Sequence, residues 1–479
     1  MLEQTEAEAS IAIHELAPEI PPERAFAALQ HLPHCIWFDS ASDRDSQRGR
    51  FSFVTADPVN WLSAELGDEN PWPTLHAWCQ QLPSLSSLRT EAPDLPPFLG
   101  GIAGVIGYEA GWWLEPTLRE SCNWSEAMVR QTQAMAVGVY DAVIAFDHHA
   151  SRVWLVANGL QRDWTRSTEA SHERVRTWQS FLANARPTEP RQQAPCHATS
   201  VQSNFDDNSY SLAVADIVQR ICRGDSFQVN LAQTLTTDVD LTAVELYHRL
   251  RSGNPAPYAG YLDAGDYQIL SSSPEGFLQV RDREVITRPI KGTQPRGEDT
   301  ASDHQLAEYL QASEKDRAEN TMIVDLMRND LSKVCQDTSI EVTGLCEIER
   351  YQRVQHLVST VRGRLREEAS VVDLLCAAFP GGSITGAPKV EAMKTIQTLE
   401  GQPRGAYCGS MGYLSCCGSA DWNILIRTIS KRGRQLSFPV GGGITARSDP
   451  ASETAETWHK AAGLLDAIGV VRGSDGDHR

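Results

Sequence analysis

Apolar residues along the chain recur with both a helical and a strand period, which is typical of a protein that mixes helices and strands. Helical spacing predicts helices over residues 210–222, 303–327, 371–379 and 390–399, and a last helix that begins near residue 450. Ser302 and Gln305 fit a capping box at the start of the second of these helices. In the last helix, Asp449 is expected as the N-cap and Pro450 as the first helical residue.

Strand-like runs fill much of the remaining sequence. We expect strands at residues 134–146, 152–157, 224–237, 267–270 and 284–287. The first two flank a polar stretch and predict a hairpin, and residues 281–283 are expected to lie near a turn before the last strand. The stretch 186–204, rich in Pro, Gln, Ser and Thr, is typical of a linker or long surface loop. It divides the chain into predicted regions at 1–190 and 200–470.

Composition narrows the choice of partners. The chain has 479 residues, of which 41% are hydrophobic, so a sizeable core is expected. Its formal net charge of −19 argues against binding to nucleic acid or to an anionic membrane surface. The N-terminus is acidic and lacks a hydrophobic signal core, and no apolar run is long enough for a membrane helix. The 11 cysteines contain no CxxC pair, which favours reduced thiols and a cytoplasmic protein.

Two pairs of acidic residues could hold a metal ion. Asp316 and Glu319 are three positions apart on one predicted helix, and Glu453 and Glu456 are three apart on another. Residues at this spacing share one helix face. If the two helices faced each other, their carboxylates would suit a hard cation such as Mg²⁺. For either pair alone, a solvated acidic face is the better interpretation.

Several other positions have a chemical and an ordinary interpretation. Lys291 follows a strand-like segment and could be a surface charge, an anion clamp or a nucleophile, and the surface charge is the default. The glycine-rich turns at 381–386 and 441–443 precede helices and could bind anions or be merely tight turns. Glu275 and His356 are isolated, and a lone histidine near apolar neighbours is more often a core residue than a catalyst.

Taken together, these segments resemble the chorismate-utilising enzymes. The matching motifs are GDSFQVNLAQ, SSSPEGF, PIKGT, EKDRAENTMIVDLMRNDL, QHLVS, FPGGSITGAPKVEAM, NILIRT and GGGITARSDPASETAET, and they occur in the family's order. The N-terminal segments GGIAGVIGYEAG and MAVGVYDAVIAFDH match the family's first half more weakly. The resemblance implies an α+β fold like that of anthranilate synthase component I, with two large antiparallel sheets in a sandwich-like core and helices outside.

The resemblance also implies roles for residues in one cleft. Glu319 and Glu456 would hold Mg²⁺, supported by Asp316 and Glu453, and the metal would bind the ring carboxylate of chorismate. Glu275 would be the general acid for departure of the C4 hydroxyl, and His356 would orient groups at the ring. The residues expected to bind the substrate are Gln228, Thr293, Thr385, Tyr407, Arg427, Gly442, Gly443 and Lys460.

Two positions imply a branch of the family. Isochorismate and salicylate synthases tend to have lysine where this chain has Gln228, so addition of water is disfavoured. Anthranilate synthases usually have alanine where this chain has Lys291, whereas aminodeoxychorismate synthases tend to have lysine. The implied activity is therefore amination of chorismate to 4-amino-4-deoxychorismate, an activity of the transaminase class, with Lys291 attacking C2. Anthranilate synthase component I is the alternative.

The ammonia is expected to come from a separate glutamine amidotransferase subunit. None of the 11 cysteines has glycine at both −2 and +2, as a triad glutaminase elbow would need, so no amidase domain is expected in this chain. Residues 39–52, including Arg48, match the place where some relatives hold tryptophan, and the ligand there is left open. Two further alternatives are a noncatalytic subunit of the same fold and a lyase that uses Lys291 as a Schiff base.

Overall fold

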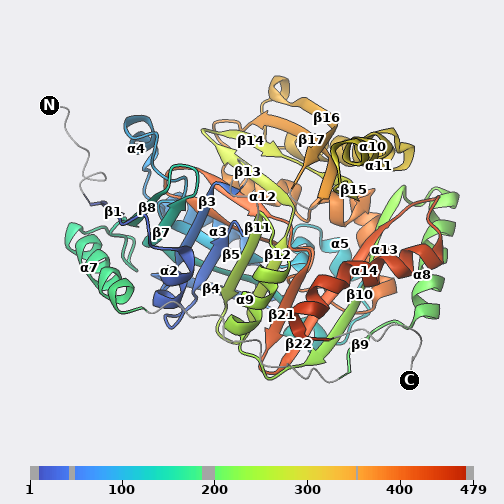
Figure 1. Ribbon diagram of the computed structural model, residues 1–479, viewed down its shortest axis with the longest axis horizontal. Helices are drawn as coiled ribbons and strands as arrows, with labels where there is room; N and C mark the ends of the chain where they lie inside the picture. Colours follow the sequence, from blue (N-terminus) through green and yellow to red (C-terminus); the bar gives the residue numbers. More distant parts are fainter. Residues whose placement is uncertain (1–9, 42–48, 186–199, 352–353, 471–479) are drawn as a thin grey trace.

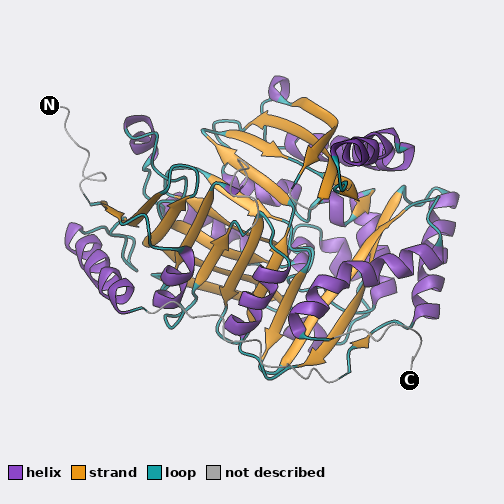
Figure 2. Ribbon diagram, viewed as in Figure 1, coloured by secondary structure: helices purple, strands orange, loops and turns teal. Residues whose placement is uncertain are grey.

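The computed structural model describes residues 10–41, 49–185, 200–351 and 354–470. These residues form two large antiparallel sheets flanked by helices (Figure 1, Figure 2), which confirms the expected α+β class. In the part of the chain that is described, no helix combines the length and the apolar character needed to cross a bilayer.

The larger sheet has 12 strands among the described residues. Their order is β1 (Ala12–Leu16), β8 (Arg152–Ala157), β7 (Ala142–Asp147), β3 (Phe51–Thr55), β2 (Ile36–Asp39), β11 (Tyr258–Asp263), β12 (Gln268–Ser273), β21 (Thr428–Arg432), β22 (Gln435–Ile444), β10 (Gln228–Asp238) and β18 (Gly386–Ala387), with β9 (Gln202–Ser203) beside β10. Strands of the first region occupy one end of the sheet, and β2 pairs with β11 of the second region. Figure 1 shows this passage from blue strands to green and red ones.

The smaller sheet has 10 strands among the described residues. Their order is β15 (Ile290–Pro295), β17 (Val354–Arg364), β14 (Glu284–Thr287), β13 (Gly276–Arg281), β20 (Ala420–Asn423), β19 (Ser410–Ser415), β5 (Gly101–Ile106), β6 (Gln133–Tyr140) and β4 (Asn60–Glu65), with β16 (Glu341–Arg350) beside β17. Both sheets therefore contain strands from both predicted regions. The expected linker lies largely in residues 186–199, outside the described residues, and the division at that point stays a prediction.

Successive residues of a strand point to opposite faces of the sheet, and this alternation builds the core in layers. On β7, Val143 and Ala145 pack with Ala103 and Val105 of β5 between the sheets, whereas Ile144 faces the helices outside. The outer face of the larger sheet is covered by α2 (Pro22–Leu29), α7 (Thr168–Asn184), α9 (Ala243–Gly253) and α14 (Pro450–Ile468). The outer face of the smaller sheet is covered by α3 (Trp72–Gln81), α11 (Glu314–Ser332) and α12 (Val371–Ala378).

The remaining helices connect or close these layers. Around β10 lie α8 (Asp207–Arg223) and α13 (Lys389–Glu400), and α10 (Thr300–Ala312) precedes α11. The shorter helices are α4 (Ser86–Glu91), α5 (Pro116–Glu120) and α6 (Glu126–Gln131), with 3-10 turns η2 (Tyr108–Trp112), η3 (Asp337–Ser339) and η4 (Gly382–Ile384). Helices α11 and α14 lie at the same end of the molecule (Figure 1), and this places the two predicted acidic pairs near each other.

Several elements match the expectations closely. The last helix begins at Pro450, and the Asp449 side chain accepts a hydrogen bond from the N–H of Ser452, so the predicted N-cap is confirmed. Strand β14 spans the four residues expected, and the turn before it is confirmed by the positive φ angles of Asp282 and Arg283. The expected strand at 224–237 begins later, at Gln228, because Gly224 is the left-handed C-cap of α8.

The prediction of one strand over residues 134–146 is wrong. The segment forms β6 and β7, which belong to different sheets and meet at Asp141. The buried Asp141 carboxylate accepts a hydrogen bond from Arg174 Nε, at 3.1 Å, on α7. A continuous apolar run conceals this crossing, because both strands are buried on both faces. The expected hairpin with residues 152–157 is confirmed for β7 and β8.

The prediction of one helix over residues 303–327 is also wrong. The chain forms α10 and α11, and Ser313 between them is the N-cap of α11, where its side chain accepts from the N–H of Asp316. The capping box of α10 joins Asp299 to Ser302, three residues earlier than the expected pair of Ser302 and Gln305. The break allows α11 to start over β15.

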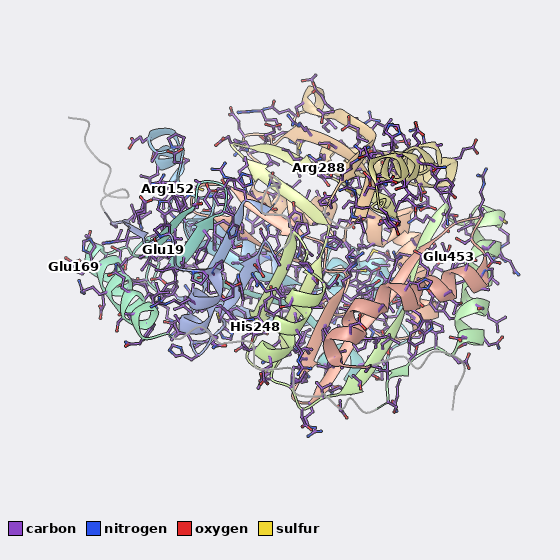
Figure 3. The ribbon with its side chains drawn as sticks, viewed as in Figure 1. Glu19, Arg152, Glu169, His248, Arg288 and Glu453 are labelled. Carbon is purple, nitrogen blue, oxygen red and sulfur yellow. The ribbon has the colours of Figure 1, made fainter. Side chains whose placement is uncertain are left out.

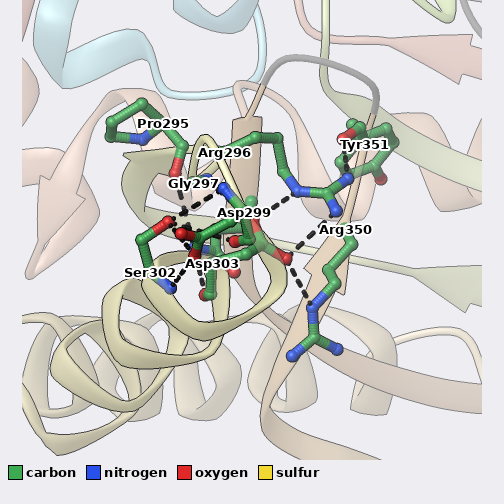
Figure 4. A network of polar contacts seen from close by, with 9 residues as sticks. Pro295, Arg296, Gly297, Asp299, Ser302, Asp303, Arg350 and Tyr351 are labelled. Atoms are coloured by element: carbon green, nitrogen blue, oxygen red, sulfur yellow. Dashed lines mark hydrogen bonds and ion pairs between the residues drawn. The ribbon is translucent and has the colours of Figure 1, made fainter.

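A polar network fixes the start of α10 against the end of β15. Figure 4 shows Asp303 accepting hydrogen bonds from Arg296 Nε, at 2.7 Å, and from the N–H of Gly297, at 2.9 Å. The Arg296 side chain also donates to the carbonyl of Tyr351. These contacts lower the pKa of Asp303 to about 2. The strand that carries Lys291 is thereby tied to the helices above it.

Candidate active site

A cavity of about 700 Å³ lies where the two sheets, α11 and α14 meet. It is lined by thirteen of the residues that the sequence predicted for the site: Glu275, Lys291, Thr293, Asp316, Glu319, His356, Tyr407, Arg427, Gly442, Gly443, Glu453, Glu456 and Lys460. These residues come from positions up to 185 apart in the numbering of the chain, between Glu275 and Lys460. The fold therefore gathers most of the predicted set in one place.

Lys291 projects into this cavity from β15. The ladder between β15 and β17 shifts register between Lys291 and Thr293, at Gly292 with φ of +71°. A Cβ atom at Gly292 would lie 2.9 Å from the Asp316 side chain, so glycine lets α11 approach the strand closely. Burial lowers the pKa of Lys291, and the nearby Glu319 and Glu275 carboxylates only partly offset this. A lysine in such surroundings has a larger neutral fraction, as a nucleophile requires.

Glu275 lies between β12 and β13 and is 7% exposed. Burial raises the pKa of its carboxyl group, although a hydrogen bond from Ser383 and the charge of Lys291 act in the opposite direction. The carbonyl of Ser383 also accepts from Lys291 Nζ, at 3.4 Å. Ser383 thus contacts both groups, and a candidate proton donor and a candidate nucleophile face the same cavity.

His356 is held by a neighbouring strand. Its Nδ1 lies 2.9 Å from Thr293 Oγ1, and the two residues are register partners on β15 and β17. The ring of Tyr351 meets the imidazole edge-on at 5.2 Å. The side chain of Thr293 can therefore fix the orientation of the His356 ring at the cavity wall.

The positive charge expected for binding carboxylates is also present. Within the described part of the chain, no hydrogen bond or ion pair engages the guanidinium of Arg427, and burial lowers its pKa. An uncompensated cation in a partly dry wall is a strong site for an anionic group. Tyr407 is buried nearby, with the Arg404 guanidinium 5.7 Å from its ring centre. Lys460 Nζ donates to the carbonyl of Gly441 at 2.9 Å.

The four carboxylates line the cavity as two pairs. Glu319 Oε1 is buried without a hydrogen-bond partner, and burial raises the pKa of this group. Glu453, on the first turn of α14 (Figure 3), lies 3.7 Å from Lys315 Nζ. Glu456 lies 2.7 Å from Lys460 Nζ. Burial alone would raise the pKa of Glu456, but the Lys460 ammonium lowers it overall.

Glycine keeps the space between these groups open. A Cβ atom at Gly442 would lie 3.2 Å from Lys460 Nζ and 3.6 Å from Glu453 Oε2. Within the described ranges, no group of three or more His, Cys, Asp or Glu side chains is gathered closely enough to hold a metal ion as it stands. The carboxylates share one cavity and are ligands of the kind that Mg²⁺ prefers. Because they are not gathered around one point, the metal site stays a prediction.

Two predicted residues do not line the cavity. Gln228 is fully buried, and both polar atoms of its side chain lack partners among the described residues. A Cβ atom at Gly443 would lie 2.7 Å from Gln228 Nε2 and 3.5 Å from Lys291 Nζ, so Gln228 stands directly behind the wall. The hydroxyl of Thr385 donates to the carbonyl of Gly381, at 2.9 Å, and this contact shapes the loop before α13.

The cavity also includes polar residues that the sequence did not single out. They are Asn230, Asn254, Lys315, Ser383 and His459. Asn230 had a weak signal, because it lies two residues after Gln228 on a predicted strand and therefore faces the same side. For Ser383, which lies in a glycine-rich turn, no period indicates where the side chain points.

A buried ionic network supports the wall behind Asn230. The Arg404 guanidinium donates to both Glu400 oxygens and to the carbonyls of Ile384 and Asn230. The Glu109 carboxylate accepts from the N–H groups of Arg404 and Gly405, at 2.7 and 2.9 Å. Burial raises the pKa of Glu109 to about 7.

This pKa predicts a pH-dependent contribution of Glu109 to stability. The folded state binds the Glu109 proton more tightly than the unfolded state, so stability should fall as pH rises from about 5 to 8, by roughly 3 kcal/mol. The Glu109→Gln variant has no carboxyl group to titrate at this position, so the hydrogen bonds and charge of its side chain are the same at every pH. We expect Tm of wild type to fall relative to Tm of the variant across this range. Parallel Tm curves for the two proteins would contradict the prediction.

A second cavity, of about 730 Å³, lies where relatives were expected to hold tryptophan. It is lined by Asp39, Ser40, Arg50 and Phe51, among others. Asp39 already accepts hydrogen bonds from Arg251 and Tyr247. Arg48, singled out in the sequence, lies outside the described residues. The ligand of this cavity stays open.

Comparison with known proteins supports the resemblance that the sequence motifs indicated. The family described as chorismate binding enzyme matches residues 33–466. Aminodeoxychorismate synthase component 1 of Salmonella typhimurium is 37% identical over 460 residues, covering 93% of this chain and 95% of the relative. Anthranilate synthase component 1 of Thermus thermophilus is 38% identical over 379 residues, covering 78% and 79%. The crystal structure of anthranilate synthase component I from Streptococcus pneumoniae matches with a TM-score of 0.75 and 31% identity, covering 87% of this chain and 92% of that one, which confirms the expected fold.

Proposed function

Because the chain belongs to the family of chorismate binding enzymes, we propose that it aminates chorismate to 4-amino-4-deoxychorismate, the aminodeoxychorismate synthase component 1 reaction. Percentage identity alone does not choose this branch, since an anthranilate synthase component 1 is 38% identical, although it matches 78% of this chain against 93% for the aminodeoxychorismate synthase relative. The observation that carries the proposal is the partly buried Lys291, which faces the cavity together with Glu275. The activity belongs to the transaminase class of transferases.

In the proposed reaction, the neutral amine of Lys291 attacks C2 of chorismate. The two conjugated ring double bonds shift toward C4 as the C4–O bond breaks, and Glu275 gives its proton to the departing hydroxyl, which leaves as water. Ammonia then attacks C4, both double bonds shift back, and the C2–N bond to Lys291 breaks. Lysine and Glu275 return to their starting protonation states as the attacking nitrogen loses a proton.

The remaining residues would hold the substrate in position for these steps. Arg427 and Lys460 provide positive charge for the two carboxylates of chorismate, with Tyr407 and the N–H groups of Gly442 and Gly443 beside them. His356, oriented by Thr293, lies at the same wall. Gln228 is a neutral amide near Lys291 and cannot activate water as a base, which supports an amine as the group that attacks C2.

Mg²⁺ is the proposed cofactor, held by Glu319 and Glu456 with Asp316 and Glu453 in support. The unpartnered, buried Glu319 Oε1 supports this assignment, as does the all-carboxylate donor set. When bound, the ion would supply positive charge for the ring carboxylate of chorismate.

Removal of one proposed ligand should change the requirement for Mg²⁺. We expect Glu319→Gln to raise the Mg²⁺ concentration needed for half-maximal product formation by at least the 10–100-fold typical of disturbed metal sites. Glu314→Gln is the control, because Glu314 lies on the same helix but is exposed and paired with Arg447. An unchanged Mg²⁺ titration for Glu319→Gln would remove this residue from the metal site.

The ammonia would come from a partner glutamine amidotransferase subunit, and free ammonium salts would replace the partner in vitro. The product would enter the synthesis of 4-aminobenzoate and folate after a separate lyase step. The proposed location is the cytoplasm.

Product analysis tests the proposal against the alternative of anthranilate synthase component I. Wild type is incubated with chorismate, Mg²⁺ and an ammonium salt at alkaline pH, and the products are separated and identified by mass. We expect 4-amino-4-deoxychorismate without release of pyruvate. Formation of anthranilate and pyruvate would assign the chain to the other branch.

A further inference from the structure

The cavity wall contains Asn230, a polar residue to which the proposed function assigns no role. It lies on β10, is 7% exposed and lines the cavity beside Tyr407 and Ile384. Its Oδ1 atom is buried, and no described group donates a hydrogen bond to it. A buried amide oxygen without a partner destabilises the folded protein, so an arrangement of this kind is typical of a group that awaits a ligand.

The backbone of Asn230 is fixed from both sides. Its N–H donates to the carbonyl of Thr385, at 2.8 Å, and its carbonyl accepts from Arg404 Nη2, at 2.9 Å. Arg404 is in turn held by Glu400 and by the loop that Glu109 caps. The side chain therefore projects from a backbone whose position is fixed before a ligand binds.

The position of Asn230 relative to Lys291 indicates which part of the ligand it meets. A Cβ atom at Gly443, the register partner of Asn230 on β22, would lie 3.5 Å from Lys291 Nζ, so Asn230 is close to the part of the cavity where C2 would lie. The step of roughly 6.6 Å between Gln228 and Asn230 along the strand is longer than the separation of substituents on C2 and C4 of a six-membered ring, and the Asn230 side chain can span the difference. Asn230 is thus placed for the C4 substituent.

The chemistry of the ligand leads to the same position. Under the proposed function, the carboxylates and the ether oxygen of chorismate only accept hydrogen bonds. The C4 hydroxyl is the one donor in the substrate, and the C4 amino group is its counterpart in the product. We propose that Asn230 is a specificity-determining residue whose Oδ1 accepts a hydrogen bond from the C4 substituent, first the hydroxyl and then the entering nitrogen. This inference rests on the proposed function for the identity of the substrate.

Binding in the absence of turnover tests the contact directly. In a Lys291→Ala background, calorimetry compares chorismate with an analogue in which hydrogen replaces the C4 hydroxyl. We expect the protein with Asn230 to prefer chorismate by about tenfold, as for one buried hydrogen bond. With Asn230→Val added, this preference should fall to less than about twofold. Thr234→Val, the same kind of change farther along β10, is the control and should keep the preference.

Stability distinguishes a ligand-binding role from a structural one. Asn230→Val removes an unpartnered buried amide, so its Tm should equal or exceed that of the parent, whereas loss of a structural contact would lower it. If valine lowers Tm through its shape, Asn230→Ala in the same binding comparison gives the decisive result. Full retention of the preference for chorismate in the folded variant overturns the inference. Failure of the parent protein to bind chorismate would instead count against the proposed function.

Discussion

Lys291→Ala is expected to lower the rate of 4-amino-4-deoxychorismate formation by about 10³-fold, equivalent to about 4 kcal/mol of transition-state stabilisation. The variant lacks the amine that attacks C2, so departure of the C4 hydroxyl would have to proceed without a nucleophile. The fold should be unaffected, because the lysine side chain makes one long hydrogen bond, at 3.4 Å to Ser383, in the described structure. Product formation is measured with chorismate, Mg²⁺ and a fixed concentration of neutral ammonia.

Trapping of the covalent intermediate gives an independent measurement. Wild type mixed with chorismate and Mg²⁺ without ammonia should gain a mass equal to chorismate less one water, located on the peptide that contains Lys291. Lys431→Met is the matched control, because burial also lowers the pKa of Lys431, which lines a different cavity. It should keep the adduct, and Lys291→Ala should lose it. An adduct that persists in Lys291→Ala, or amination at the wild-type rate, would show that Lys291 is not the nucleophile.

Local sequence signals were sufficient for elements whose ends are marked by caps and turns. The N-cap at Asp449 and the turn before β14 are set by residues adjacent in the chain, so they could be predicted. The crossing at Asp141 could not, because strands buried on both faces lose the alternation that marks a change of sheet. The break at Ser313 was missed because the polar residues 313–317 include no glycine or proline to mark a helix end.

In the candidate site too, only some of the residues could be predicted from local sequence signals. Its titratable residues could be proposed from motifs in a fixed order, and the fold brings thirteen of them to one cavity. Residues that act through position alone had no such signal. Ser383 matters because its hydroxyl and its carbonyl reach Glu275 and Lys291, and Asn230 matters because its oxygen lacks a partner. Both properties depend on contacts between distant segments, which no local pattern records.

Glu275→Gln is expected to lower the rate of amination by about 10²–10⁴-fold, the range typical of a lost general acid. Hydroxide is a poor leaving group, and glutamine cannot supply the proton that converts it to water. The variant keeps the size and polarity of the side chain, so binding of chorismate should change much less than the rate. The measurements are kcat under saturating substrates and the dissociation constant of chorismate.

The pH profile at a fixed concentration of neutral ammonia provides the sharper test of Glu275. Wild type needs Lys291 neutral and Glu275 protonated, so its rate should rise and then fall with pH as the pair loses two protons. In Glu275→Gln one titration is gone, and only the rise from deprotonation of Lys291 should remain. That rise should not move to lower pH, because Glu275 is protonated and neutral in the productive form of wild type, as glutamine is in the variant. Asp421→Asn is the control. Burial also raises the pKa of this carboxyl group, but Asp421 lines the second cavity, so the variant should keep both limbs of the pH profile. A two-limbed profile in Glu275→Gln, with a rate within about tenfold of wild type, would assign the proton to another donor.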